Sequence, residues 1–139
     1  MRKQIIAVLS LCLVLAGSAF AAKSAPAMPG ILANARYVYV TAYDGDQYSS
    51  RLLPDDRAAI SRVQDAIQKW GKLTLVYRPE DADMVIAVQS RPSEDVLAVY
   101  DGRSSSQTYL WRVMGRGGLQ KGETPLITQF QLAFEKIAH

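Results

Sequence analysis

Residues 54–89 read PDDRAAISRVQDAIQKWGKLTLVYRPEDADMVIAVQ, and this stretch decides the fold of the 139-residue chain. It predicts a helix over residues 55–70, followed by strands over residues 73–77 and 84–88. The second strand, Met84–Val88, is a fully apolar run, and outside the N-terminus it is the longest one without an aromatic residue. A short apolar run that is rich in β-branched residues is typical of a strand covered on both faces. We therefore expect this strand to lie inside a sheet that the helix covers.

The predicted helix has one apolar side, formed at helical spacing by Ile60, Val63, Ile67 and Trp70. Pro54 suits the start of a helix, because its missing N–H would have no intrahelical partner there. Gly71 suits the end, because glycine readily adopts the left-handed conformation that closes many helices. The apolar side needs a surface to cover, and the predicted strands supply it.

Further strands are predicted over residues 36–43, where tyrosines alternate with valines, and over residues 96–100 and 109–114, which are expected to pair with each other. A second helix is expected to begin at Thr124 and Pro125, and its apolar stripe is Ile127, Phe130, Phe134 and Ile137. The predicted order is β-α-β-β-β-β-α. This is an α/β fold of the α+β type, with a single mixed sheet and two helices packed on the sheet. The connections after the first helix look too short for crossovers, so we expect those strands to be antiparallel.

The N-terminus has the three parts of a secretory signal peptide. Arg2 and Lys3 form a positive start, residues 5–16 are an almost unbroken apolar run, and Ala19-Phe20-Ala21 is a cleavage motif. The apolar run is shorter than the roughly 20 residues of a membrane-spanning helix. The residue before Cys12 is not the small residue that a lipid-attachment motif needs. We expect cleavage after Ala21, no lipid, no transmembrane segment after signal cleavage, and a periplasmic or secreted protein.

The chain therefore divides into three predicted parts: a signal peptide over residues 1–21, a flexible lead over residues 22–35, and a single α/β domain over residues 36–139. The lead carries Pro26 and Pro29 among small residues and has no helical or strand period. A mature chain of this length can bury one sizeable core, which favours a single domain.

Cleavage after Ala21 would also change the composition. The formal net charge of +3 would fall to +1, because Arg2 and Lys3 are removed. A nearly neutral exported chain gives no reason to expect nucleic-acid binding. The single cysteine, Cys12, would be removed as well, so the mature protein would have neither a disulfide nor a thiol nucleophile.

No arrangement of residues points to catalysis or to a cofactor. The single histidine, His139, is the last residue, and without a mature cysteine neither a zinc motif nor Cys/His catalysis is available. Asp44-Gly45-Asp46 lacks the glutamate of a calcium loop, so we expect a plain turn. Asp81 and Asp83 suit a solvated turn before a strand. We predict that the protein is not an enzyme and has no catalytic, cofactor or metal residues.

One face of the first predicted strand carries tyrosines, and the other carries valines and an alanine. Tyrosine and arginine are enriched at protein interfaces. The candidate interaction surface is Tyr37, Tyr39, Tyr43, Arg112 and Arg116. Two functions remain open: a protein-interaction module of the cell envelope, or a small-ligand or glycan-binding domain that uses the same side chains for stacking. In a competing arrangement the phenylalanines of the second helix cover the tyrosines.

Two motifs resemble a known group of proteins. Residues 79–88 read PEDADMVIAV, which has the pattern P-E-x-A-D-x-V-I-x-V, and Asp101-Gly102 precedes Leu110-Trp111-Arg112 in a predicted hairpin. Both are similar to small exported bacterial domains that resemble the TolB amino-terminal domain and related envelope-assembly domains. The chain departs from that pattern at residues 103–107, which replace a tight turn. The resemblance implies the α/β layout above and an envelope role, often in binding an envelope protein. It implies no catalytic residue.

Overall fold

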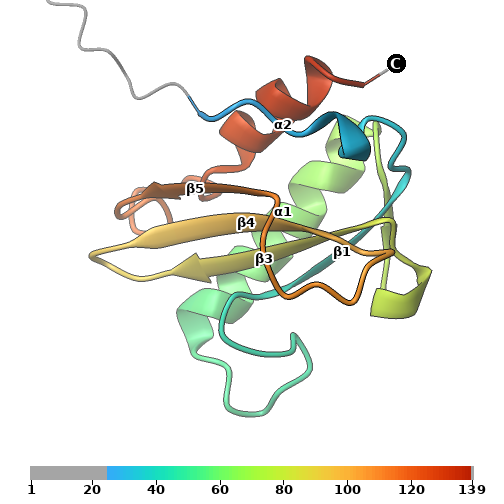
Figure 1. The fold of residues 1–139 in the computed structure, drawn as a ribbon. Coiled ribbons are helices and arrows are strands. Elements are labelled where there is room, and N and C mark those ends of the chain that lie inside the picture. Colours follow the sequence, from blue (N-terminus) through green and yellow to red (C-terminus); the bar gives the residue numbers. More distant parts are fainter. Residues whose placement is uncertain (1–24, 139) are drawn as a thin grey trace, which may run out of the picture.

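The computed structural model describes residues 25–138, and its centre is one five-stranded mixed sheet (Figure 1). The strands are β1 (Tyr37–Ala42), β2 (Thr74–Val76), β3 (Met84–Ser90), β4 (Asp95–Asp101) and β5 (Trp111–Gly115). Their order in space is β2-β1-β3-β4-β5, so the apolar run that was predicted to lie inside the sheet is its middle strand. With helices α1 (Pro54–Trp70) and α2 (Ile127–Glu135), this confirms the predicted order β-α-β-β-β-β-α and the predicted fold class.

The predicted signal peptide lies outside the described residues, as do residues 22–24 and His139. Cleavage after Ala21 therefore stays a prediction. Within residues 25–138, none of the helices has the length and apolar character that crossing a membrane requires.

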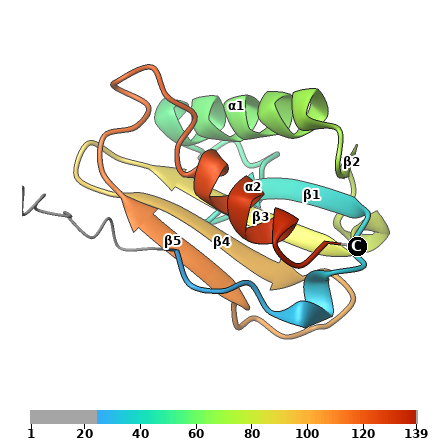
Figure 2. The same ribbon diagram turned by 90° about the horizontal axis from the view of Figure 1, so that it is seen from above.

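Both helices lie over the same face of the sheet (Figure 2). α1 has Pro54 at its start, and Gly71 ends it with a φ of 76°. These are the ends that the sequence predicts, because each depends on one residue with a strong local preference. The side of α1 that faces the sheet buries Ala59, Ile60, Val63 and Ile67.

An aromatic cluster joins the two helices to β5. The ring of Phe130 on α2 lies edge-on to Trp70 at 6.0 Å and to Trp111 at 6.2 Å between ring centroids. Phe134 stacks on Phe130 at 6.0 Å. Such pairs each contribute about 0.5–1.5 kcal/mol beyond the burial of their area. The same core contains the valines of β1, so the arrangement in which the phenylalanines of α2 cover the tyrosines of β1 is wrong.

α2 begins later than the sequence predicts. Thr124 and Pro125 precede it, and its first residue is Ile127. Leu126 has a φ of 59°, a left-handed conformation that an α-helix cannot contain. Its side chain lies against Gly115 at the end of β5, where an added Cβ would be only 2.9 Å away. The contact between Leu126 and β5 therefore outweighs the local helix-start signal.

The short connection between β2 and β3 predicts that these two strands are antiparallel, and this prediction is wrong. Both strands pair in parallel with β1, one on each side of it, so residues 77–83 must pass from one side of β1 to the other, and they do so near its first residues. The last residue of β2 and the first of β3 pair with neighbouring residues of β1, Tyr39 and Val38. The chain therefore needs to move only about 10 Å sideways, which is two strand spacings and well within the reach of the connection.

Asp83 fastens this crossover to the start of β1. Its Oδ2 accepts backbone hydrogen bonds from Arg36 at 2.9 Å and from Tyr37 at 3.2 Å. Its Oδ1 accepts a hydrogen bond from Nε of Arg103 at 3.1 Å. Asp83 thus joins β1, the crossover and the loop after β4, and it is not a free carboxylate in a solvated turn.

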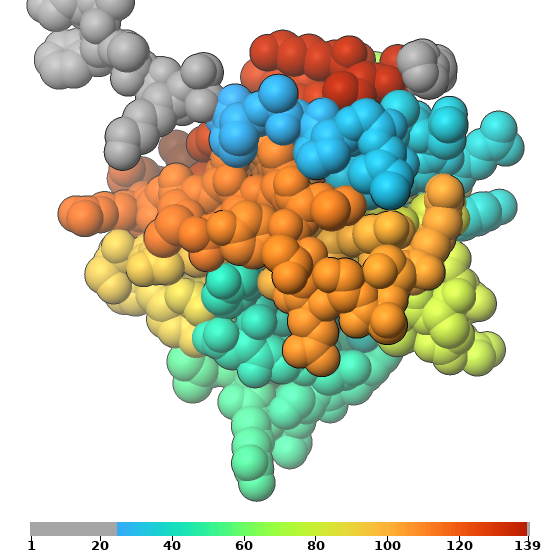
Figure 3. Space-filling view, in the orientation of Figure 1, coloured from blue at the N-terminus to red at the C-terminus, as the bar shows by residue number. Residues whose placement is uncertain are grey.

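Residues 25–35 are not a flexible lead, because they pack into the core. Their buried side chains are Met28, Leu32 and Ala35. A turn of 3-10 helix, η1, spans Gly30–Leu32, and the Trp111 side chain donates a 2.6 Å hydrogen bond to the carbonyl of Pro26. Figure 3 shows the segment, in blue, lying directly against the residues in orange that include β5. The sequence pattern missed this because widely spaced apolar residues among prolines have no period.

Candidate functional site

The helices leave one face of the sheet open, and its side chains form rows across the strands. The register of the strands gives the first row as Tyr39, Val85 and Tyr100, and the middle row as Thr41, Ala87, Ala98 and Arg112. A last row consists of Tyr43, Gln89, Val96 and Met114. These residues, with Tyr37 and Tyr109, are called the open face below.

Arg112 lies across the middle row of the open face. Its Nη1 donates a long hydrogen bond, 3.4 Å, to the hydroxyl of Tyr43, which follows β1. β1 and β5 are three strand spacings apart, about 14 Å, so both side chains must extend toward each other. Ala98 and Ala87 occupy the strands between them and are 0% and 4% exposed, although no helix covers them. The small alanines therefore form a floor on which the arginine lies.

Tyr109 holds the same guanidinium from another side. Its ring centroid is 4.5 Å from Cζ of Arg112, which is a cation–π contact. The two residues are on one face because β5 begins with an irregular pairing. The N–H of Leu110 donates to the carbonyl of Val99 at 2.7 Å, while Trp111 is paired with Val99 as well. Leu110 and Trp111 are thus both opposite Val99, as in a β-bulge. The extra residue reverses the face of the sheet toward which the side chains before Trp111 point.

The surroundings raise the pKa of both Arg112 and Tyr100 on the open face. The hydrogen bond with Tyr43 is the main cause that raises the pKa of Arg112 above its usual value. Burial raises the pKa of Tyr100, and the proximity of Tyr43 raises it further. At neutral pH Arg112 is therefore a cation, and the neighbouring Tyr100 is a neutral phenol.

The predicted surface residues do not all lie together. Tyr43 and Arg112 are brought together, as described above. Tyr37 lies at the far end of the same face and is 46% exposed. Arg116 is exposed, but it follows β5 and lines a different cavity, beside the start of α2. The sequence did not point to Tyr109, because strict alternation along β5 places it on the other face.

Tyr39 is also on the open face, but it does not reach the surface. It is only 2% exposed, because the chain after β1 folds back beside it. Thr41 holds this fold: its Oγ1 donates to the carbonyl of Gly45 at 3.1 Å and accepts the N–H of Gln47 at 3.0 Å. The prediction that Tyr39 belongs to an accessible surface is therefore wrong. Burial is also the main cause that raises the pKa of Tyr39.

A groove of about 520 Å³ runs along the outer edge of β5. One wall consists of residues 25–27 and Gln129 of α2, and the other consists of residues 109–114. Met114, at the edge of the open face, is 52% exposed. The groove and the open face therefore meet along β5, with Arg112 belonging to both.

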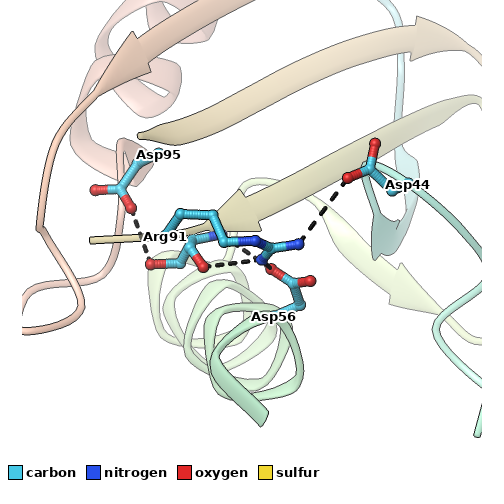
Figure 4. A network of polar contacts seen from close by, with 5 residues as sticks. Asp44, Asp56, Arg91 and Asp95 are labelled. Atoms are coloured by element: carbon cyan, nitrogen blue, oxygen red, sulfur yellow. Dashed lines mark hydrogen bonds and ion pairs between the residues drawn. The ribbon is translucent and has the colours of Figure 1, made fainter. Parts of the chain in front are cut away.

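A second polar cluster lies at the carboxyl end of β3, where it meets α1 (Figure 4). Asp56, in the first turn of α1, is 4% exposed. Its Oδ1 accepts the backbone N–H of Ser90 at 3.1 Å and a hydrogen bond from Nη1 of Arg91. Arg91 also lies 4.0 Å from a carboxylate oxygen of Asp44. The hydrogen bond with Asp56 is the main cause that raises the pKa of Arg91.

The same cluster contains a second buried carboxylate, Asp95. It accepts a hydrogen bond from Oγ of Ser90 at 2.8 Å and one from the backbone N–H of Gly118 at 2.7 Å. Both carboxylates are thus occupied by groups that join β3 and β4 to α1 and to the loop after β5. Within residues 25–138, no group of three or more histidine, cysteine, aspartate or glutamate residues is placed to hold a metal ion. We assign this cluster to the stability of the fold.

Comparisons with known proteins give one weak match, to a solved structure. No family model matches the chain. No curated protein matches it either. Among solved structures, the chain is similar to PelC in a dodecamer from Paraburkholderia phytofirmans, with 19% identity, a TM-score of 0.39, and coverage of 76% of this chain and 93% of that chain. A similarity of this size says nothing about a ligand or a partner. The resemblance to the TolB amino-terminal domain stays a prediction.

Proposed function

We propose that the protein is an exported, non-catalytic module of the cell envelope that binds a partner protein through the open face. The observation that carries this proposal is the position of Arg112, which lies between Tyr43 and Tyr109 on a face without a helix. Arginine and tyrosine are the side chains that most often dominate binding energy at protein interfaces. Because the guanidinium is already held in place, binding would cost little side-chain entropy.

Binding is favoured over turnover by the state of the buried acids. Asp56 and Asp95 already accept hydrogen bonds from the surrounding chain. Neither carboxylate is left to act as a general base. The open face offers a cation and aromatic rings, which are groups suited to binding the surface of another protein.

A glycan or another small ligand is the second candidate, and the exposed rings favour it. Tyr37 and Tyr109 are 46% and 39% exposed, so part of each ring is open to stacking. The two candidates differ in the size of what they bind. A saccharide would perturb the resonances of these rings alone, whereas a protein would also cover Met114 on the neighbouring row.

The test is site-specific photo-crosslinking in the organism's own envelope. A photoreactive amino acid replaces Met114 on the open face or, as the matched control, Leu132 on α2. The two side chains are similarly exposed, at 52% and 56%. The strand register places Met114 on the open face, whereas Leu132 belongs to α2, which covers the other face. We expect a discrete crosslinked protein with position 114 and none with position 132. Equal crosslinking at both positions, or none at 114, contradicts the proposal.

Substitutions then test the energetics of the same partner. We expect Tyr109→Ala and Arg112→Ala each to weaken binding by about 1–2 kcal/mol or more. Tyr48→Ala is the control, because Tyr48 is 65% exposed but lies outside the open face. Export is tested separately by mass spectrometry of the envelope fraction, where the first residue should be Ala22.

A further inference from the structure

The outer edge of β5 is not paired with another strand in the described part of the chain. β5 is the last strand of the sheet in the described part of the chain, with β4 as its neighbour. Natural proteins usually protect such edges with lysine or proline, or with a charged side chain that blocks the approach of another strand. Residues 111–115 contain neither lysine nor proline. Their one charged side chain, Arg112, lies on the open face beside the groove, where it donates to Tyr43, and does not block the edge of the strand.

Residues 25–29 border this edge without pairing with it. Within residues 25–138, no backbone hydrogen bond joins this segment to β5. Pro26 and Pro29 have no N–H to donate, so the segment cannot form a regular ladder. The hydrogen bond that does join the segment to β5 is donated by the indole of Trp111 to the carbonyl of Pro26. The segment therefore forms a wall of the 520 Å³ groove and leaves the strand edge available.

The charge of the groove indicates which chemical group of a partner it would bind. Among the described residues, Arg112 is the only charged one that lines the groove. None of the salt bridges among the described residues involves it. A guanidinium has five N–H donors, and within residues 25–138 only one of those of Arg112 is engaged, with the hydroxyl of Tyr43. The remaining donors match a carboxylate, the acceptor that arginine binds most strongly.

We propose that the β5 edge binds an extended segment of the partner protein as a sixth strand, with an aspartate or glutamate of that segment beside Arg112. The proposal rests on the proposed function and specifies the partner of the same site. Main-chain hydrogen bonds along β5 would supply affinity, and the carboxylate would supply selectivity. Tyr109 and Met114 would contact the side chains that the added strand directs toward the open face.

The test uses two synthetic peptides of eight residues with blocked ends. Both alternate threonine and valine, and they differ at one central position, which is glutamate in one and lysine in the other. Binding to the full mature chain is followed by NMR, together with hydrogen exchange of the amides of residues 111–115. We expect the glutamate peptide to slow exchange along β5 and to bind at least about tenfold more tightly than the lysine peptide.

Charge reversal identifies the residue responsible. Arg112→Glu should reverse the preference, so that the lysine peptide binds more tightly, and Arg112→Gln should abolish the preference. Arg116→Glu is the matched control: it changes the same charge, but Arg116 does not line the groove, so the preference for glutamate should remain. An unchanged preference in both Arg112 variants overturns the proposal.

Three other results also overturn it. The first is equal binding of the two peptides, or no binding of either. The second is slowed exchange away from β5. The third is protection of β5 that grows with protein concentration without any peptide, which would mean that a second copy of the chain occupies the edge. If the peptides fail while crosslinking at Met114 still captures a partner, this inference is wrong and the proposed function stands.

Discussion

Arg112 is on β5 and Tyr43 directly follows β1, and the strands β3 and β4 lie between them. Their side chains meet across these two strands, with 3.4 Å between Nη1 and the hydroxyl oxygen. The contact depends on what lies beneath it. Only a very small side chain on β3 and on β4 leaves room for an arginine to lie flat, and Ala87 and Ala98 meet this need. The two alanines therefore matter to the open face as much as the residues that show on its surface.

Ala98→Leu should displace Arg112 and destabilise the protein. Ala98 is paired with Arg112 and is fully buried, so a larger side chain has no free space. We expect the free energy of unfolding to fall by about 1–3 kcal/mol in urea denaturation. In an Arg112→Ala background the same change should cost less, because the space is then open. Equal costs in both backgrounds would show that the two residues are not coupled.

Tyr39→Ala should act on stability. Since Tyr39 is 2% exposed, its loss leaves a cavity, and we expect the free energy of unfolding to fall by about 3–5 kcal/mol. Tyr37→Ala is the control on the same strand face. Tyr37 is 46% exposed, and its loss should cost about 0.5 kcal/mol or less. Thermal melts of the two variants that agree within error would contradict the buried position of Tyr39.

Asp56→Asn should destabilise the protein, and Asp55→Asn should not. Asp56 is 4% exposed and pairs with Arg91, so its loss leaves a largely buried cation without its partner. We expect a cost of about 2–3 kcal/mol in chemical denaturation, at the lower end for such pairs because Arg91 keeps some contact with water. Asp55 is the neighbouring residue in the same helix turn but is exposed. A similar loss in both variants would point to the helix dipole as the cause.

Asp83 should make the protein sensitive to acid. Burial raises its pKa, but hydrogen bonds from the N–H groups of Arg36 and Tyr37 and from Arg103 lower it by more, so the net pKa in the folded state is lowered. The resulting stability is present above the unfolded pKa of about 3.9 and is lost as the pH falls through the lower folded value. Asp83→Asn should therefore be less stable than the wild type at pH 7, and the difference should narrow below about pH 4.

The check is urea denaturation at a series of pH values from neutral to strongly acidic. Asp81→Asn serves as the control, since Asp81 is close in sequence but exposed. Its acid profile should follow that of the wild type. A constant difference between wild type and Asp83→Asn at all pH values would mean that the ionised carboxylate is not what matters.

Gly102→Ala should prevent a close approach of two chain segments. A Cβ at this position would lie 2.4 Å from the carbonyl oxygen of Ala82, a backbone atom that cannot move alone. We expect a loss of about 3 kcal/mol or a failure to fold, because the crossover must shift. Gly30→Ala is the control, since an added Cβ there meets nothing within 4 Å. Circular dichroism and thermal melts of both variants provide the comparison.

The parts of the fold that follow from local signals could be predicted from the sequence. Pro54 and Gly71 mark the ends of α1 because each has a strong conformational preference of its own. The apolar run that became β3 predicted the middle of the sheet, since such a run is stable only when it is covered. The valines of β1 predicted which side of that strand meets the core.

The parts that depend on distant contacts could not be predicted. The crossover between β2 and β3 needs the position of β1, and the left-handed Leu126 needs its contact with Gly115. The irregular pairing at Val99 brings Tyr109 beside Arg112, and no spacing in the sequence indicates it. The pairing of Asp56 with Arg91 was missed for the same reason, because the two residues are far apart in the chain.

The packing of residues 25–35 into the core determines when, during synthesis, the protein can finish folding. Met28 and Leu32 belong to the same core as Phe130 and Phe134, so the first described residues need the last ones before they can be buried. A ribosome or an export channel delivers the chain from its N-terminus, and contacts between distant residues form slowly even in a free chain. The core therefore stays open until α2 has emerged. Chains stalled before residue 127 should be digested by a protease that leaves the finished domain intact. A protein that folds so late stays unfolded during its synthesis and can still pass through a narrow channel.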